Sequence, residues 1–290
     1  MLWGIPYLFI KVAVDDGVPP AFVAWVRVAL AAVVLLALAQ RAGVLNTLRG
    51  RGRWLAFYAL VEIAIPFPLI AAAEVNVSSS LTAIVIATVP LLIALLALRY
   101  DHAERATGRR LAGLVIGLGG VVALVGIDVA ESSDELLGVG AILVACFGYA
   151  VGPMLLKHRL AGLDPRATMG VSLAIAGLLL TPLAALDPPT AMPSGAALLS
   201  LLLLGLLCTA AAFVVFSVLI AEVGPGRALV ITYLNPIVAV ALGVTILGER
   251  PGVGAVAGLL LILAGSWLST DGRLPPGLAA RAARLRTRTS

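Results

Sequence analysis

The chain has 290 residues, of which 61% are hydrophobic and only 12% are charged, whereas soluble domains carry roughly 25% charged residues. A soluble core cannot hide this much apolar surface, so lipid must cover part of it. The formal net charge of +5 does not call for a nucleic-acid partner, because the basic residues fall in loops between apolar runs, where positive charge sets membrane topology.

Runs of about 20 apolar residues recur along the chain, which predicts an all-α integral membrane protein. The first run is short, since its helix would measure about 20 Å against a bilayer core of about 30 Å. Either the natural start lies upstream, or this helix begins deep in the bilayer. We predict ten transmembrane helices, at about 2–14, 20–40, 54–73, 78–98, 110–127, 137–156, 167–186, 196–220, 228–248 and 252–269.

The basic residues predict the orientation of these spans. Of the 20 lysines and arginines, Lys11 and Arg27 fall inside spans and Arg250 falls in an outer loop. All the others lie in loops or the tail that are cytoplasmic if the N-terminus is inside. We therefore expect a multi-pass protein of the bacterial inner (plasma) membrane with both termini in the cytoplasm.

Two basic residues lie within the first two predicted spans. Lys11 sits about 5 Å from the outer end of its span by helical rise. It either reaches outward to Asp15 or Asp16 or contacts a substrate. Arg27 lies about 10 Å inside its span, so it should face the helix bundle and pair with another group. Structural anchoring and substrate binding are both open for it.

Glu62 lies near the middle of the third span, about 12 Å from its inner end. A charge at that depth costs roughly 2.5–3.5 kcal/mol on insertion scales. Pairing with Arg27, protonation, or a watery cavity that holds a substrate or a proton would each relieve this cost. Pro66 and Pro68 follow within two turns, so the span should bend just beyond the acid.

Prolines inside later spans predict helix breaks. Pro90 lies in the fourth span, Pro153 in the sixth and Pro236 in the ninth. Each frees the carbonyl four residues earlier, and in lipid that carbonyl must face protein or a wet cavity. Each proline fits either a simple packing kink or a functional break. The polar side chains beside the breaks are the candidates to line a cavity: Tyr149, Tyr233 and Asn235.

Other conspicuous side chains fit structural roles. The serines and threonine within 78–82 open the fourth span and should cap its helix. Glycines recur at about one-turn spacing in the fifth and tenth spans and permit close helix packing, which indicates a scaffold or a homodimer face. His102 and His158 are isolated in loops, so we expect neither a metal site nor a cofactor.

Short matches relate the two halves of the chain. The tripeptide at 73–75 recurs at 221–223, and the dipeptide at 104–105 recurs at 249–250. The prolines of the fourth and ninth spans also correspond. Each half has five spans, an odd number, so the second half should be inverted in the membrane. We predict one five-helix repeat at 1–128, an inverted five-helix repeat at 137–270, and a basic cytoplasmic tail at 271–290.

These segments resemble the drug/metabolite transporter superfamily, in its branch with ten helices and two EamA domains. The opening WGIPYLFIK resembles the pattern of helix 1 and adds Trp3 to the candidates, while PPAFVAWVRVALAA resembles helix 2 with Arg27. ATVPLLIALLAL and YLNPIVAVALGVTILGERP resemble helices 4 and 9. The resemblance covers about residues 3–269 and implies inverted repeats and transport of small metabolites, often by export. It implies no role for Glu62.

We therefore expect a secondary transporter that moves amino-acid-like or drug-like metabolites by alternating access, with export as the expected direction. Its partners would be a small-molecule substrate and membrane lipid, with no nucleic acid and with a homodimer left open. The alternatives are an integral-membrane enzyme acting on lipid-like substrates and a non-transporting scaffold. An enzyme should show a cluster of acids, histidines or metal ligands, and the sequence has none, nor a nucleotide-binding loop.

Overall fold

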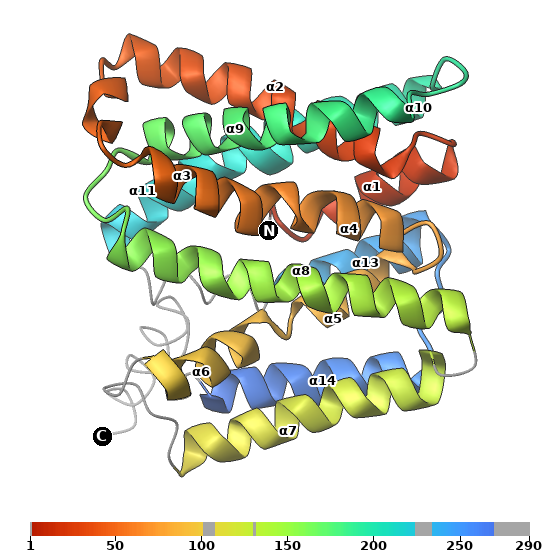
Figure 1. Ribbon diagram of the computed structural model, residues 1–290. Helices are drawn as coiled ribbons and strands as arrows, with labels where there is room; N and C mark the ends of the chain where they lie inside the picture. Colours follow the sequence, from red (N-terminus) through yellow and green to blue (C-terminus); the bar gives the residue numbers. More distant parts are fainter. Residues whose placement is uncertain (1, 101–107, 130–131, 224–233, 270–290) are drawn as a thin grey trace, which may run out of the picture.

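The computed structural model describes residues 2–100, 108–129, 132–223 and 234–269, and the regular elements in these ranges are all helical. The long helices run roughly parallel or antiparallel to one another (Figure 1). Within the described ranges, five helical segments are long and apolar enough to cross a membrane, and four shorter apolar helices accompany them.

The first half of the chain folds into helices that match the first five predicted spans. The segments are α1 (Pro6–Asp15), α2 (Pro20–Arg41), η1 (Leu45–Leu48), α3 (Gly52–Tyr58), η2 (Ala59–Ala64), α4 (Pro66–Ala73), α5 (Ser79–Ile86), α6 (Val89–Tyr100), α7 (Arg109–Leu124) and η4 (Val125–Val129). Here η1 is a short 3₁₀ turn, η2 is a wide π-helical turn between α3 and α4, and η4 is a wide π-helical turn that follows α7.

The second half continues the pattern. Its segments are α8 (Ser133–His158), α9 (Pro165–Leu186), α10 (Gly195–Gly205), η5 (Leu206–Ala211), α11 (Ala212–Val223), α13 (Asn235–Ile246) and α14 (Val253–Ser269). The π-helical turn η5 joins α10 to α11 without a break in the helix. Residues 224–233, which include the first residues of the predicted ninth span, are outside the described ranges.

Local sequence signals explain where these helices begin. A proline occupies the first turn of α1, α2, α4, α9 and α13, where its missing N–H costs no helical hydrogen bond. Side-chain oxygens cap four helix starts, α9 among them, as expected for serine and aspartate. The capping residues are Ser78 before α5, Ser132 before α8, Asp164 before α9 and Ser194 before α10.

The prolines predicted to break helices behave differently from one another. The helix is interrupted between Ile86 and Val89, just before Pro90. Of the two alternatives left open for Pro153, the structure does not show the break, because α8 continues through it as one helix from Ser133 to His158. Transmembrane helices tolerate a proline where neighbouring groups satisfy the freed carbonyl. Pro236 lies in the first turn of α13.

Side chains from two other helices contact backbone carbonyls at the break before Pro90. The Cys146 thiol on α8 lies 3.7 Å from the Val85 carbonyl oxygen, and the Ser266 hydroxyl on α14 donates to the Ala87 carbonyl at 3.4 Å. Both carbonyls therefore face protein rather than lipid, as an interrupted helix in a membrane requires.

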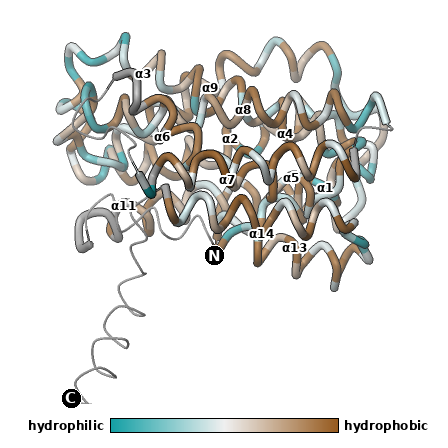
Figure 2. The backbone as a smooth tube through the Cα atoms, turned by 90° about the horizontal axis from the view of Figure 1, so that it is seen from below, coloured by the Kyte–Doolittle hydropathy of each residue, from teal (hydrophilic) through white to brown (hydrophobic). Residues whose placement is uncertain are grey.

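Apolar and polar residues are separated along the helix axes. Figure 2 shows apolar residues along the middle of the helices and hydrophilic residues toward their two ends. The α2–α3 and α8–α9 connections lie at one end of the bundle (Figure 1) and carry Arg49, Arg51 and Arg159. We call this the basic end. The opposite end, with the α1–α2 turn, carries Asp15 and Asp16, and we call it the acidic end.

The largest helix contacts join the two halves of the chain. Helix α2 packs on α9, α4 on α8, α1 on α10, α5 on α13 and α7 on α14. In the numbering of the predicted spans these pairs are 2 with 7, 3 with 6, 1 with 8, 4 with 9 and 5 with 10. When each span of the first half is exchanged with its counterpart in the second half (1 with 6, 2 with 7, and so on), the same set of pairs results.

Glycines bring α7 and α14 into close contact. A side chain on Gly258 would meet the Gly120 carbonyl oxygen at 2.9 Å, and one on Gly120 would meet the Gly258 carbonyl oxygen at 3.0 Å. The glycine spacing predicted for the fifth and tenth spans is thus used inside the chain. A homodimer stays a prediction, and it would need another surface.

Candidate functional site

The third predicted span contains a wide turn at Glu62. The Ile65 N–H donates to the Leu60 carbonyl, five residues earlier, at 3.0 Å. Pro66 and Pro68 have no N–H to donate to the carbonyls four residues before them, which favours such a wide turn. Turns of this kind are frequent at functional sites. The segment η2 therefore holds Glu62 at the predicted bend.

The second half has a matching wide turn, η5. The Thr209 hydroxyl donates to the Leu204 carbonyl, five residues earlier, at 2.8 Å. The recurring tripeptide, at 73–75 and 221–223, defines a shift of 148 residues. This shift carries η2 onto residues 207–212, one residue from the position of η5. The two wide turns therefore occupy corresponding places in the halves.

Arg27 of α2 makes its contacts with η5 and α4. Its side chain is 8% exposed, and its Nε–H donates to the Thr209 hydroxyl at 2.8 Å. The guanidinium carbon lies 4.0 Å from the centre of the Phe67 ring, a favourable cation–π geometry. With the residues that the structure describes, the terminal guanidinium nitrogens make no hydrogen bond.

Glu62 is not the partner of Arg27. Glu62 has no ion pair with any described residue, and its buried Oε2 accepts no hydrogen bond from them. Of the three alternatives that the sequence left open for Glu62, the structure does not show the pair with Arg27. Arg27 instead donates to Thr209, which lies 182 residues away in the sequence.

Two glycines on α8 receive the wide turn that carries Glu62. A side chain on Gly152 would lie 2.6 Å from the Glu62 Cδ atom, and one on Gly148 would lie 3.2 Å from the Val61 carbonyl carbon. Such distances are not compatible with an added Cβ atom. The Gly-x-x-x-Gly spacing lets the two backbones approach closely, and it holds the carboxylate against α8.

Tyr149 lies on the same stretch of α8, between the two glycines. It is close enough to both Arg27 and Glu62 for their charges to act on its phenol group. The structure therefore brings three predicted site residues together. We call Arg27, Glu62, Tyr149 and Thr209 the central polar cluster.

Two other predicted candidates, Trp3 and Asn235, lie apart from the central polar cluster in the sequence, and Asn235 packs against the N-terminal segment. Trp3 packs on α11, with ring centroids 5.7 Å from Phe213 and 4.7 Å from Phe216. The Asn235 Oδ1 atom, at the start of α13, is buried and accepts no hydrogen bond from the residues that the structure describes. The backbone of Gly4 passes so close that an added Cβ atom would be 2.7 Å from the Asn235 carbonyl oxygen.

The remaining candidates are Lys11 and Tyr233. Lys11 reaches toward the acidic end, where its Nζ pairs with Asp15 at 3.0 Å and donates to the Glu74 carbonyl at 2.8 Å. This is the outward-reaching alternative from the sequence. Tyr233 lies outside the described residues.

The sequence did not predict a group of buried polar contacts at the acidic end. Glu249, after α13, accepts hydrogen bonds from the Ser79 N–H at 2.7 Å, from the Ser80 N–H at 2.9 Å, and from the Ser80 hydroxyl. Ser78 caps α5 as predicted, its hydroxyl accepting from the Leu81 N–H at 3.1 Å. Glu74 is fully buried. We had noted both acids only as parts of the internal repeat.

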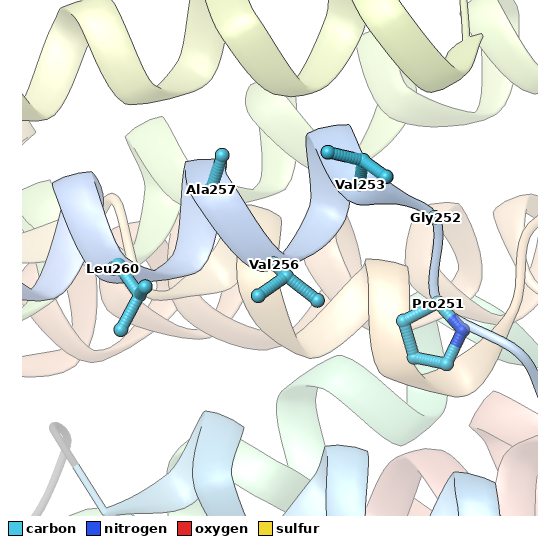
Figure 3. Close-up of a pocket in the computed structure, with 6 residues that line it drawn as sticks. All are labelled: Pro251, Gly252, Val253, Val256, Ala257 and Leu260. Carbon is cyan, nitrogen blue, oxygen red and sulfur yellow. The ribbon is translucent and has the colours of Figure 1, made fainter.

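Two hollows on the surface do not reach the central polar cluster. One of about 370 Å³ lies at the start of α14, between Pro251 and Leu260, and Figure 3 shows its apolar lining. The other, of about 860 Å³, lies under the 188–193 loop and is lined by Phe22, Val26 and apolar residues of α10. Neither hollow is lined by a residue of the central polar cluster.

The EamA-like transporter family matches residues 1–126 and 136–270, which together make up most of the chain. The chain belongs to the EamA-like transporter family. This EamA-like transporter is similar to the uncharacterized inner membrane transporter YedA of Escherichia coli K12, with 31% identity over 267 residues, 86% of this chain and 80% of YedA. As a member of this family, the chain is a membrane transporter.

Two further comparisons extend over nearly the whole EamA-like transporter. A probable amino-acid metabolite efflux pump of Escherichia coli K12 is 24% identical over 285 residues, 94% of this chain and 92% of the relative. A solved structure, described only as the crystal structure of a protein, has a TM-score of 0.65 at 22% identity and covers 93% of this chain and 96% of its own. The likeness to this solved structure concerns the fold alone.

Proposed function

We propose that this transporter exports small amino-acid-like or drug-like metabolites across the inner membrane by alternating access between two inverted five-helix repeats. The observation that carries the proposal is the central polar cluster. It places a buried cation, Arg27, and a partly buried acid, Glu62, in the core without pairing them.

The cluster has the charges that a zwitterion needs. The terminal nitrogens of Arg27 make no hydrogen bond with the described residues, and a planar guanidinium is well suited to bind a carboxylate. The Glu62 Oε2 atom also has no hydrogen-bond partner in the described part of the chain, and a carboxylate can accept from an ammonium group. Unpaired buried charges are costly, so an amino acid that meets both would be bound favourably.

The name of one relative favours amino-acid-like substrates as well. One relative is named as a probable amino-acid metabolite efflux pump, and its name gives the export direction as well as the kind of cargo. Tyr149, which is near both charges, would lie beside the side chain of such a substrate. We place substrate contact at the central polar cluster, with Trp3 and Asn235 as further candidates.

Two observations support inverted repeats and alternating access. The set of main helix contacts is unchanged when the halves are exchanged, and the wide turns η2 and η5 correspond within one residue. Transporters with inverted repeats bind substrate between the halves, near the middle of the membrane. The central polar cluster takes residues from α2, η2, α8 and η5, so both halves contribute to it.

The charge distribution supports a cytoplasmic basic end. The loops at that end carry arginines, and positive loops stay in the cytoplasm. The N-terminus and the basic tail at 271–290 would then both be inside, and the acidic end would face outward. We assign the protein to the inner membrane of a bacterium on the same grounds, together with the name of its relative YedA.

Counterflow in proteoliposomes tests the proposal. Vesicles containing the purified full chain would be loaded with one unlabelled neutral amino acid and given the same amino acid, radiolabelled, outside. We expect accumulation of label above protein-free vesicles, with less for the N-acetyl derivative, which lacks the ammonium charge. Absence of counterflow across a panel of the twenty standard amino acids would contradict the amino-acid class.

A further inference from the structure

A second acid, Glu74, is buried more deeply than Glu62. It follows α4 directly at the acidic end, and its side chain is 0% exposed. Neither of its carboxyl oxygens makes a hydrogen bond with any residue that the structure describes. The mechanism proposed for the central polar cluster does not use this residue, so its burial needs a separate explanation.

The nearest cation is engaged with other groups. Lys11 donates to the backbone carbonyl of Glu74, at 2.8 Å, and pairs with the Asp15 carboxylate at 3.0 Å. It therefore passes the Glu74 carboxyl group without a hydrogen bond to it. Lys11 contributes a favourable charge at a distance, but it does not form the close pair that a buried carboxylate requires.

The other charges around Glu74 come from three segments. Arg27 of α2 favours its ionised form, whereas Asp15 of α1 and Glu249 of the α13–α14 loop oppose it. Tyr7 of α1 also lies within electrostatic range of Glu74. Glu249 itself is held by the N–H groups of Ser79 and Ser80, so its negative charge is fixed close to Glu74 in this structure.

The balance of these contacts favours a neutral carboxylic acid. A carboxylate without water or hydrogen-bond donors loses its hydration energy without compensation, and the neighbouring negative charges add to the cost. Opening of the acidic end would separate the α13–α14 loop from α5 and admit water to Glu74. The ionised form would then become favourable, and the proton would leave to the outside.

We propose that Glu74 is a proton-binding site that is occupied when the acidic end of the transporter is closed and empties when that end opens. This inference rests on the proposed alternating access and assigns a proton as the coupled ion. It differs from the sequence hypothesis for Glu62, because it places the proton beside the outer closure and apart from the substrate charges.

Infrared spectroscopy of the full chain in lipid membranes tests the protonation state. The carbonyl band of a protonated carboxyl group is separate from the bands of carboxylates and shifts in heavy water. At neutral pH we expect a component of this band in the wild type that is lost in Glu74→Gln and retained in Glu62→Gln. If Glu74→Gln does not fold, Glu74→Asp should shift the band. A spectrum unchanged by Glu74 substitution would overturn the proposal.

A second variant tests the link to opening. Glu249→Ala removes both the contacts to α5 and a negative charge, so the acidic end should open more readily. The infrared band should then be lost at a lower pH than in the wild type, whereas Arg250→Ala, one residue away, should leave it unchanged. An identical titration in Glu249→Ala would contradict the link. Neither infrared measurement needs a substrate, so the protonation of Glu74 can be determined even if amino-acid counterflow is not observed.

Discussion

At the scale of single residues, the absence of a side chain at Gly152 determines where Glu62 lies. The carboxylate occupies the space that a Cβ atom would fill. Sequence analysis predicted that Glu62 would be near mid-membrane and that Arg27 would need a partner. It could not predict that Thr209 and Phe67 would be the partners, because these contacts depend on how distant segments pack.

We predict that Gly148→Ala destabilises the protein by about 1–3 kcal/mol, as overpacking of a filled core does, because an added Cβ atom there would meet the Val61 backbone. Gly140→Ala on the same helix is the matched control, because an added Cβ atom there meets nothing within 4 Å. Thermal unfolding of both purified variants measures the difference. Equal unfolding temperatures would show that Gly148 is not needed to seat the wide turn η2.

Asp164 provides a prediction for the basic end. Its Oδ1 accepts from the Arg166 N–H at 2.9 Å, and its Oδ2 accepts from the Arg166 side chain at 2.8 Å. These hydrogen bonds lower the pKa of Asp164 below its ordinary value, which is about 3.9. The stabilisation should therefore be complete above about pH 4 and be lost as the pH falls through the lowered pKa.

Asp164→Ala should thus cost about 1 kcal/mol at neutral pH, as loss of a helix cap does. The difference from the wild type should shrink when the pH falls well below 4. Thermal unfolding at pH 7 and pH 3 measures this, with exposed Asp187→Ala at the other end of α9 as the control. A difference that is the same at both pH values would show that the ionised cap is not responsible.

At the scale of elements, helix existence was predictable and helix detail was not. The length of the apolar runs in the sequence predicted the helical segments, because the thickness of the bilayer sets the length of each span. The wide turns η2 and η5 were not predicted, although Pro66 and Pro68 indicated a bend. Pro153 shows the converse, since α8 continues through it. A proline sets the local hydrogen bonding, but the surrounding helices decide whether the chain bends.

The contact between α7 and α14 leads to a prediction at this scale. Gly258→Leu would place a large side chain against Gly120 and Leu124, and we expect a loss of stability of at least about 1–3 kcal/mol. Gly119→Leu is the control, because no atom lies within 4 Å of an added Cβ atom there. Thermal unfolding compares them. A destabilised Gly119→Leu with an unaffected Gly258→Leu would indicate that the glycines serve a different surface.

At the scale of the whole molecule, the two halves meet around opposite charges that are not paired. The short sequence matches predicted the relation between the halves, and the helix contacts and wide turns correspond to it. The contacts within the central polar cluster and those of Glu249 at the acidic end could not be predicted, because they join segments distant in the sequence.

The most direct test of this account is the substrate preference of Glu62→Gln in proteoliposome counterflow. If Glu62 binds the ammonium group, the wild type should prefer an amino acid over its N-acetyl derivative, and Glu62→Gln should lose most of that preference. Arg27→Lys should instead weaken preference for the amino acid over its carboxamide, because the planar guanidinium is gone. A wild-type preference that persists unchanged in Glu62→Gln would contradict the assignment of the central polar cluster as the substrate site.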